Sequence, residues 1–450
     1  MNRISFSKCC LVILCLLITY PIAAVDTLTI TIEEAVNIAL SENLTIKVAD
    51  REIERKDYMK KEKISGLIPA LNATGTFQRN FKNQVMTMTV NDQVNTIEIG
   101  APNTFNGTFN LSLPIIAPTL WQNIKLSEVD IERSIEAARA SKIDLIVEVK
   151  NAYYGAMLTK DSYNVLLKNY IQAKENARVI KERFKQGVTS EYEVIRSEVN
   201  VRNLEPSLLQ AETGVGLSLL RLKVLLGIDL ELPIDIKGTL TDYESDLTHE
   251  IIEDHHSIEN NTSLRKLDIE AKYLERAYKV QRSQRLPSLF ASGSFGYMAM
   301  EKRFNVFDYN WRNFSNAGLT LSIPIFEGMA KSHREKQTRI AIDAMKLQRE
   351  EAERNLTLAY VSQNEEIRKT MKQIASNKEG MAMAEQGYTI ALKTYEVGSG
   401  SFIELNDAEL ASLQSKLTYN QALHDYLIAK SNLENLLGNI DTETNRIENK

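Results

Sequence analysis

Two short stretches of this chain place carboxylates shortly after a glycine. They are RFKQGVTSEYEV, Arg183–Val194, and TYEVGSGSFIEL, Thr394–Leu405. Among the acids that follow the glycines, the candidates for a role are Glu193, Glu404 and Asp407. We expect them in the first turns of helices, where the N-terminal end of the helix dipole stabilises negative charge. A structural role for these carboxylates therefore competes with a functional one, and the sequence leaves both open.

Side chains suited to catalysis are scarce elsewhere. All three cysteines occupy positions 9, 10 and 15, and the whole chain has five histidines. His255 and His256 are neighbours in an acidic segment, where a metal site would need further ligands at suitable spacing. We expect a solvated linker there. A glycine-rich phosphate-binding loop is also missing, so we predict no enzymatic activity, no cofactor and no metal site.

Composition restricts the possible partners. The formal net charge is −5 and a quarter of the residues are charged, whereas proteins that bind nucleic acid usually carry a basic patch. We therefore predict no nucleic-acid partner. After residue 24, no apolar run reaches the length of about 20 residues that a membrane helix needs. If the chain crosses a membrane, it does so without apolar helices.

The first 24 residues have the features of a secretory signal. Arg3 and Lys8 precede an apolar run, Cys9–Tyr20, and the small-residue end PIAA. A basic start, a short apolar core and a small-residue end are typical of a signal peptide. A lipoprotein signal requires a small residue directly before its cysteine, and none of the three cysteines has one. We predict a signal peptide over residues 1–24, without lipidation.

An internal repeat covers most of the chain. Gly187 and Gly398 lie 211 positions apart, as do the glycines that end two Leu-Leu-Gly motifs, Gly227 and Gly438. Two upstream motifs are also duplicated: LIPALNATGTF (Leu67–Phe77) with RLPSLFASGSF (Arg285–Phe295), and LSLPI (Leu111–Ile115) with LSIPI (Leu321–Ile325). Such self-similarity defines structural units. We predict a first copy over 25–238, an acidic connector over 239–260, a second copy over 261–438 and a polar tail over 439–450.

Each copy has the same predicted order of elements. A helix opens it, and in the first copy Thr31 and Glu34 are placed to form a capping box. A pair of strands follows, then a long helix, a glycine turn and a returning helix that ends at Leu-Leu-Gly. The predicted strand pairs are 72–90 with 104–114 and 289–299 with 316–324, and the hairpin tips lie near 184–194 and 395–405.

The strand segments alternate apolar and polar residues. One face of the segment from Thr104 to Leu113 carries Phe105, Gly107, Phe109, Leu111 and Leu113. A soluble sheet with one buried face would show this alternation, and so would a membrane β-barrel. The polar positions hold hydroxyls, amides and glycines rather than lysine and glutamate, and the loop of the second pair is aromatic, as in an interfacial girdle. Both features favour the barrel. The loop aromatics are Phe304, Phe307, Tyr309, Trp311 and Phe314.

Four strands cannot close a membrane barrel. Bacterial barrels start at about eight strands. An open sheet edge in lipid would leave N–H and C=O groups unpaired, at several kcal/mol each. If the strands span a membrane, several chains must contribute to one barrel.

Two segments predict helices of unusual length. Proline is missing from about Thr119 to about Gln186 and again over 328–397. At about 1.5 Å per residue, each helix would be roughly 100 Å long. Apolar residues recur every seven positions in the first segment, which is typical of a coiled-coil seam: Ile124, Ile131, Ala138, Leu145 and Ala152. In the first returning helix, Pro206 is expected to kink or split the helix near Leu204.

In their order and duplication, these motifs resemble the outer-membrane efflux proteins, the TolC-like exit ducts of Gram-negative bacteria. The resemblance rests on the start LTITIEEAVNIALSEN, the proline-flanked strand pairs, the two glycine tips and the two Leu-Leu-Gly ends. It implies a mostly α fold with a small β part. Long coiled-coil hairpins would form a trimeric α-barrel, and four strands per chain would contribute to a shared trimeric transmembrane β-barrel.

The resemblance also implies a function and partners. The protein would be a passive homotrimeric channel-tunnel in the outer membrane, in contact with its lipid and extending into the periplasm. It would dock a periplasmic adaptor (membrane fusion) protein and an inner-membrane pump of the RND, ABC or MFS type. Tripartite efflux or type I secretion would then export small molecules or polypeptides. A soluble periplasmic coiled-coil adaptor or scaffold is the alternative, although it would not need paired alternating strands with aromatic loops.

Tip residues follow from the same resemblance. Contacts with the adaptor are expected at Phe184, Gly187, Val188, Thr189, Tyr395, Gly398, Ser399 and Gly400. In the family, a lock joins a tyrosine and an arginine near the second glycine to an aspartate after the first. Tyr395 matches the tyrosine and Glu193 the aspartate, but Gly400 takes the place of the arginine, so that salt bridge cannot form in the same manner. The candidate gate residues are Glu193, Glu404, Asp407 and Tyr395, and threefold copies of the acids would form rings that favour cations.

Overall fold

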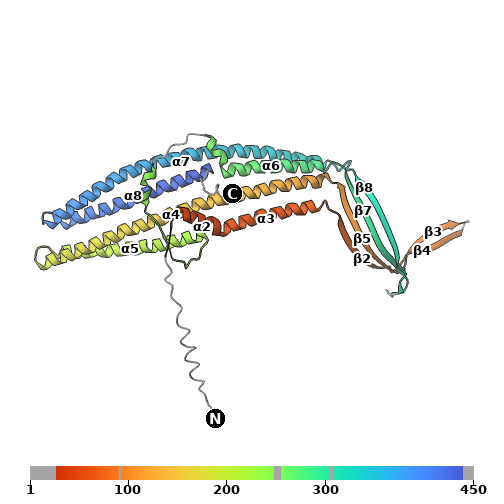
Figure 1. Ribbon diagram of the computed structural model, residues 1–450, viewed down its shortest axis with the longest axis horizontal. Helices are drawn as coiled ribbons and strands as arrows, with labels where there is room; N and C mark the ends of the chain where they lie inside the picture. The colour runs from red at the N-terminus through yellow and green to blue at the C-terminus, as the bar shows by residue number, and fades with distance from the viewer. Residues whose placement is uncertain (1–26, 91–92, 248–254, 305–307, 439–450) are drawn as a thin grey trace, which may run out of the picture. The chain divides into compact units, whose positions relative to one another are not determined.

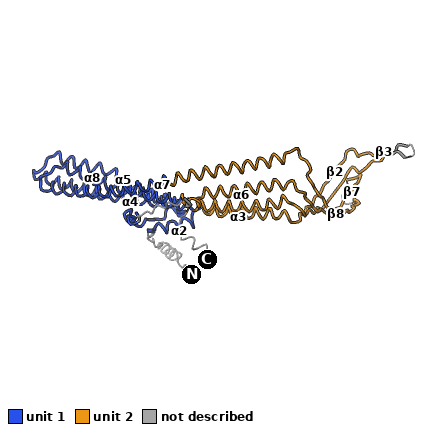
Figure 2. The backbone as a smooth tube through the Cα atoms, turned by 90° about the horizontal axis from the view of Figure 1, so that it is seen from above, with its two compact units in different colours: residues 1–44, 143–253, 361–435 blue, residues 45–142, 254–360, 436–450 orange. Residues whose placement is uncertain are grey.

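The computed structural model describes residues 27–90, 93–247, 255–304 and 308–438. The predicted signal peptide (1–24) and the predicted tail (439–450) lie outside these ranges. The chain forms two compact units, coloured separately in Figure 2. We call them the hairpin unit (residues up to 44, 143–253 and 361–435) and the sheet unit (45–142, 254–360 and from 436).

The hairpin unit contains two helical hairpins. They are α4 (Pro118–Lys185) with α5 (Glu191–Leu226), and α7 (Ala330–Glu396) with α8 (Phe402–Leu437), of which α4 and α7 begin in the sheet unit. The unit also holds α2 (Ile32–Glu42) and the parallel pair of β1 (Leu28–Ile30) with β6 (Ile234–Ile236). The predicted capping box of α2 is confirmed, because Thr31 and Glu34 each accept a hydrogen bond from the other's backbone N–H. Proline is tolerated at the first position of α4, where its missing N–H would have no helical partner.

The returning helix α5 runs through Pro206 as one helix of 36 residues, so the predicted split near Leu204 is wrong. Proline removes one backbone donor and crowds the carbonyl four residues earlier. Here Pro206 and Arg202, four residues before it, are both exposed. Water can therefore hydrate the carbonyl that loses its partner, and the helix continues.

The predicted connector, residues 239–260, is only partly the solvated linker that we expected. Its first part forms the 3₁₀ helix η1, Leu240–Leu247, and Leu240 is fully buried. The Glu244 carboxylate accepts a hydrogen bond from Lys378 Nζ on α7 at 2.5 Å, which lowers the pKa of Glu244. This part of the connector is therefore bound to the second hairpin rather than surrounded by water.

The sheet unit combines helices with most of the strands. It holds α3 (Leu44–Ser65), α6 (Thr262–Ser283) and an antiparallel sheet of β2 (Ala70–Arg79), β5 (Asn103–Ile116), β7 (Ser288–Glu301) and β8 (Arg312–Ser322). The strand order is β2-β5-β7-β8, so the two copies of the repeat meet at the centre of the sheet (Figure 1). Among the helices described, none has both the length and the apolarity needed to cross a membrane.

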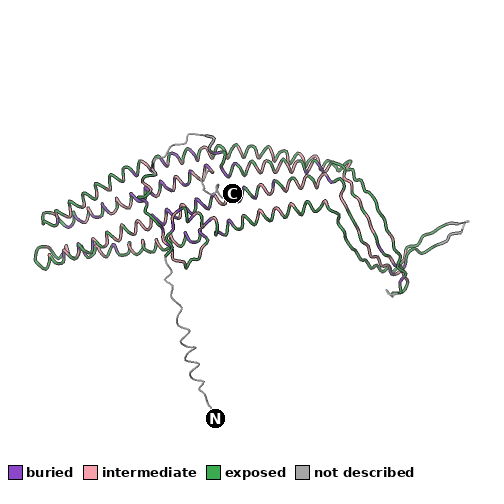
Figure 3. Tube along the Cα trace, in the orientation of Figure 1, coloured by how far each residue is buried: buried purple, intermediate pink, exposed green. Residues whose placement is uncertain are grey.

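The register places the apolar positions of the strands on one face of the sheet. Phe109 of β5 faces Ala73 of β2 on one side and Phe295 of β7 on the other. The opposite face carries hydroxyls and amides, and there the side chains of Thr74 and Thr108 hydrogen bond across the strands at 2.7 Å. Figure 3 shows the strands mostly exposed or half-buried: all ten residues of β2 are exposed, whereas β5 and β7 at the centre of the sheet are mostly half-buried or buried. The sheet therefore has an apolar and a polar face, and much of both is left open by the described residues.

Aromatic side chains gather at one end of the sheet. Phe105 lies 4.5 Å from Phe77, 5.2 Å from Tyr309 and 6.3 Å from Trp311, measured between ring centroids. The two loop residues belong to the aromatic set noted in the sequence, of which Phe307 lies outside the described residues. The loop aromatics thus pack on the apolar face of the sheet instead of extending from it independently.

The structure corrects the first predicted strand, 72–90. It is two strands, because β2 ends at Arg79 and the next strand, β3 (Gln84–Val90), pairs with β4 (Gln93–Ile99) in a separate two-stranded hairpin. At the junction the Asn80 N–H donates to the carbonyl of Pro102 at 2.8 Å. That bond closes the sheet at this end, and the residues between β2 and β5 then form the extra hairpin.

Each copy of the repeat closes with the same arrangement, which we call the asparagine–glycine lock. In the first copy, Asn43 has an extended backbone (ψ 130°) that separates α2 from α3, where one opening helix was predicted. Its Nδ2 donates to the carbonyl of Leu225 at 2.8 Å. Gly227, at φ +71°, packs so closely that a Cβ would lie 2.8 Å from the carbonyl oxygen of Glu42.

The second copy repeats the lock with equivalent residues. Asn261 Nδ2 donates to the carbonyl of Leu436 at 2.7 Å, directly after the 3₁₀ helix η2 (His255–Asn260). Gly438 has φ +64°, and a Cβ there would overlap the carbonyl oxygen of Asn260. Glycine is required at both positions because of its left-handed conformation and because no side chain would fit.

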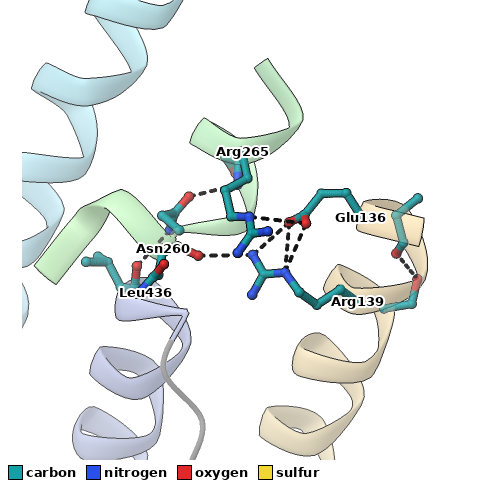
Figure 4. A network of polar contacts seen from close by, with 9 residues as sticks. Glu136, Arg139, Asn260, Arg265 and Leu436 are labelled. Atoms are coloured by element: carbon teal, nitrogen blue, oxygen red, sulfur yellow. Dashed lines mark hydrogen bonds and ion pairs between the residues drawn. The ribbon is translucent and has the colours of Figure 1, made fainter. Parts of the chain in front are cut away.

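A buried carboxylate strengthens the second lock (Figure 4). Glu136 is 4% exposed and binds two guanidinium groups, that of Arg139 at 2.7 Å and that of Arg265 at 3.3 Å. Arg139 Nη2 also donates to the carbonyl of Asn260 at 3.0 Å. The charge of the carboxylate is therefore compensated by its neighbours, which a buried carboxylate needs.

Candidate functional site at the hairpin tips

The two glycine turns have the same backbone geometry. Gly187 has φ +75° and its N–H donates to Phe184 O at 2.9 Å, and Gly398 has φ +80° and its N–H donates to Tyr395 O at 3.1 Å. A Cβ at either glycine would meet no atom within 4 Å. Glycine is favoured here by its conformation alone. Both turns therefore end a long helix in the same way.

Serine residues begin both returning helices. Ser190 Oγ accepts from the N–H of Glu193 at 3.3 Å, and Ser401 Oγ accepts from the N–H of Glu404 at 3.3 Å. In the second tip the Ser401 N–H also donates to Glu404 Oε2 at 3.0 Å, which completes a capping box. The position of Glu404 is thus explained by local structure, and its side chain is exposed.

A small apolar cluster joins the two hairpins near their tips. It contains Ile180 of α4, Tyr395 of α7, and Phe402 and Leu405 of α8, all buried. The rings of Tyr395 and Phe402 lie 6.2 Å apart. The aromatic residue before the second glycine therefore packs against its returning helix. Phe184, before the first glycine, does not join the cluster and is 43% exposed.

Arg183 links the first hairpin to the end of α7. Its Nη1 donates to Tyr395 O at 3.0 Å, its Nη2 donates to Glu396 O at 2.7 Å, and the guanidinium lies 5.1 Å from the centre of the Tyr395 ring. The last carbonyls of a helix have no partner within the helix. The guanidinium satisfies two of them from the other hairpin, and its charge suits the negative end of the α7 dipole.

In a second contact the donor is on the second hairpin and the acceptor is on the first. The Tyr395 hydroxyl donates to Glu193 Oε2 at 3.4 Å, and the Thr189 hydroxyl donates to the same carboxylate. Burial and the nearby Glu193 charge raise the pKa of Tyr395, so its hydroxyl remains a donor at physiological pH. Three of the predicted tip residues are therefore in one network, and Arg183 completes it.

The other predicted tip residues lie outside this network. Val188, Gly398, Ser399 and Asp407 are exposed. Gly400 lies in a tight position, because a Cβ there would approach the backbone N of Tyr395 to 3.2 Å. Sequence reasoning missed Arg183, although it is the first residue of the repeated stretch. The second copy has Thr394 at the equivalent place, and this difference between the copies was the available signal.

The architecture of two helical hairpins and a four-stranded sheet is that of an outer-membrane channel protein. The chain matches the model of the outer membrane efflux protein family over residues 35–228 and 255–439, and it belongs to that family. The predicted family and fold class are confirmed. Membership also decides against the alternative raised by the sequence, a soluble adaptor or scaffold.

Particular relatives share this fold at low sequence identity. The solved structure of CusC is 15% identical with a TM-score of 0.74, covering 92% of this chain and 94% of that chain. The CmeC outer membrane channel of Campylobacter jejuni is 18% identical with a TM-score of 0.69, covering 93% and 88%. Protein CyaE of Bordetella pertussis is 21% identical over 316 residues, which span 68% of this chain and 65% of the length of CyaE.

Proposed function

We propose that three copies of this chain form the exit duct of an export machine in the outer membrane. The four-stranded sheet carries this proposal. Within the described residues, β2 and β8 each pair on one side only. In lipid an open edge costs several kcal/mol for each unpaired backbone group. Pairing β8 of one copy with β2 of the next closes a barrel of about twelve strands, a size that bacterial barrels adopt.

The two faces of the sheet suit such a barrel. The apolar face, with Phe109, Phe295 and their neighbours, would contact lipid, and the face with Thr74 and Thr108 would line an aqueous lumen. The duct would lie in the outer membrane of a Gram-negative bacterium, with the hairpins in the periplasm. Because the lumen is wet and polar, solutes would diffuse through it without any catalytic step by this chain.

The tips would receive a periplasmic adaptor protein, which connects the duct to an inner-membrane pump of the RND, ABC or MFS type. Exposed apolar side chains at both turns support a protein contact there. Val188 is 70% exposed and Val397 is 79% exposed. Energy for export would come from the pump, and the cargo would be small molecules or, as in type I secretion, polypeptides.

The tip network would hold the duct closed. Arg183, Tyr395 and Glu193 join the two hairpins of one chain, so their separation would be part of opening. Glu404 and Asp407 are exposed at the start of α8, and threefold copies would form acidic rings that favour cations.

Reconstitution of the purified full chain tests this function. We expect a chemically crosslinked trimer in the outer-membrane fraction, and discrete ion conductance in planar bilayers. The double variant Glu404→Gln, Asp407→Asn should conduct with a lower cation preference, measured as a reversal potential in a salt gradient. A monomer that leaves bilayers silent would refute the duct. Unchanged reversal potentials in the double variant would refute only the acidic rings.

A further inference from the structure

A buried carboxyl lies between the two hairpins, deeper than the tips. Glu409 of α8 is 4% exposed. It continues a buried face of α8 that begins in the tip cluster: Phe402, Leu405, Glu409 and Ser412. These residues recur at intervals of three and four positions, so they share one side of the helix. Glu409 therefore occupies a position where the helical pattern calls for an apolar side chain.

Both hairpins contribute to the surroundings of Glu409. From α4, Asn169 Nδ2 donates to Glu409 Oε1 at 3.0 Å, and the Asn176 side chain also acts on the carboxyl to lower its pKa. A cavity of about 380 Å³ beside it is lined by residues of α4, α7 and α8, among them Tyr388. Glu409 is therefore in the seam, meaning the contact between α4 of the first hairpin and α7 and α8 of the second.

Charged groups line the cavity without neutralising Glu409. They are Lys168 of α4, Glu385 of α7 and Lys416 of α8. Lys416 is already paired with Glu385 at 3.0 Å. Within the part of the chain that the structure describes, no lysine or arginine forms an ion pair with Glu409. Its one side-chain hydrogen bond among the described residues, from Asn169, does not replace the water that a carboxylate loses on burial, so the ionised form is disfavoured.

We propose that Glu409 is a proton-binding site that controls the seam between the hairpins. With the proton bound, the neutral carboxyl is compatible with the packed seam. When the proton leaves, the carboxylate is better stabilised in separated hairpins, where water surrounds a residue that is only 4% exposed in the packed seam. The inference rests on the proposed function for its physiological meaning, because separation of the hairpins would open the duct.

The sign of the effect follows from the burial. Burial raises the pKa of Glu409 from its ordinary value of 4.5 to about 7, against the lowering by Asn176 and Asn169. The packed seam is therefore most stable below pH 4.5 and loses stability as the pH rises toward 7. Above pH 7 Glu409 is ionised in both states, and the free-energy cost of keeping its charge in the packed seam no longer changes with pH. The equilibrium between packed and separated hairpins should change on the order of 10²-fold across this interval.

Spin labels on α4 and α8 measure the separation of the hairpins directly, so the experiment does not depend on a conducting channel. The three cysteines lie at positions 9, 10 and 15, in the predicted signal, so labels can be placed at will. Ile171→Cys on α4 and Leu410→Cys on α8 replace exposed side chains close to the seam. Doubly labelled chains, diluted with unlabelled ones, give the α4–α8 distance distribution by pulsed electron resonance from pH 4.5 to 8.

Two variants make the measurement specific. Glu409→Gln keeps the shape and cannot ionise, and Glu379→Gln removes an exposed carboxylate of α7. We expect longer distances to gain population as the pH rises from 4.5 to 7, and to stay constant above pH 7, in the parent and in Glu379→Gln, while Glu409→Gln stays packed at every pH. Should Glu409→Gln fold poorly, Glu409→Leu serves the same purpose.

The outcomes separate this inference from the proposed function. A pH response that persists in Glu409→Gln, or a parent without any response, overturns the proton site even if bilayers conduct. A response confined to chains with Glu409 supports the site even if the bilayers remain silent, which would count against the duct alone. In conducting bilayers, the open probability should follow the same pH dependence as the distances.

Discussion

Removal of the Arg183 side chain should loosen the tips by an amount that the structure allows us to estimate. The guanidinium donates two hydrogen bonds to the terminal carbonyls of α7, at 3.0 and 2.7 Å, and lies on the Tyr395 ring. A charge-assisted hydrogen bond contributes about 1.5–3 kcal/mol when buried. Since Arg183 is only partly buried, we take about 2 kcal/mol for the whole contact. That value corresponds to roughly a 30-fold shift toward separated tips, at about 1.4 kcal/mol per tenfold.

A matched control isolates this contact. Arg178→Ala removes another arginine of α4, one that pairs with Glu175 on the same helix and, among the described residues, forms no ion pair with another element. In single-channel recordings we expect Arg183→Ala to raise the open probability at least tenfold, and Arg178→Ala to leave it unchanged. Arg183→Lys should fall between them, because an ammonium group cannot span two carbonyls as a guanidinium does. Equal open probabilities for Arg183→Ala and Arg178→Ala would falsify the idea that the contact between Arg183 and the end of α7 holds the tips together.

Further expectations concern the tip tyrosine, the glycines and the buried carboxylate. Tyr395→Phe keeps the ring in the apolar cluster and loses the hydroxyl bond to Glu193, so we expect an open probability raised by no more than about tenfold, since a typical hydrogen bond contributes about 0.5–1.5 kcal/mol. Gly227→Ala combines a left-handed backbone with a clash and should cost about 2–4 kcal/mol in denaturant unfolding followed by helical circular dichroism. Gly187→Ala has the same backbone conformation but open space around it, and should cost about 1–2 kcal/mol. Equal losses of stability in Gly227→Ala and Gly187→Ala would contradict the close packing of the asparagine–glycine lock. Glu136→Gln replaces the charge-assisted bonds to two partly exposed arginines by neutral ones and should cost about 1–2 kcal/mol in the same assay.

Local patterns in the sequence were enough to predict much of the architecture. The alternation around Phe109 and the glycines at 187 and 398 depend on residues close in the chain, and the structure shows the expected sheet faces and turns. The capping box of Thr31 and Glu34 is equally local. Each of these features is decided within about ten residues, which is the range over which periodicity and turn chemistry act.

Features that depend on distant contacts could not be predicted. Arg183 binds carbonyls more than 200 positions away in the chain. A single arginine at a helix end shows no sequence pattern from which its partner could be predicted. The parallel pairing of β1 with β6 joins strands of three residues, too short for a periodic signal. β3 was merged with β2 in the predicted strand 72–90, and β4 fell in the loop predicted between residues 90 and 104. Glu409 did carry a signal, a polar residue on an apolar helix face, but its significance appears only once α4 is seen to cover it.

The two copies of the repeat share the asparagine–glycine lock but differ at their tips. Steric constraints explain the shared feature, and their absence allows the difference. The asparagine–glycine lock is the same in both copies, since Asn43 and Asn261 bind the same carbonyl of a Leu-Leu-Gly end. Any residue other than glycine at that end would collide with backbone, so substitution there is prevented by sterics in each copy separately. The tips have no such constraint, and there Arg183 on one hairpin complements Tyr395 on the other. A contact between the two hairpins needs unlike partners, so divergence of the tips is what makes the bonds between Arg183 and the end of α7 possible.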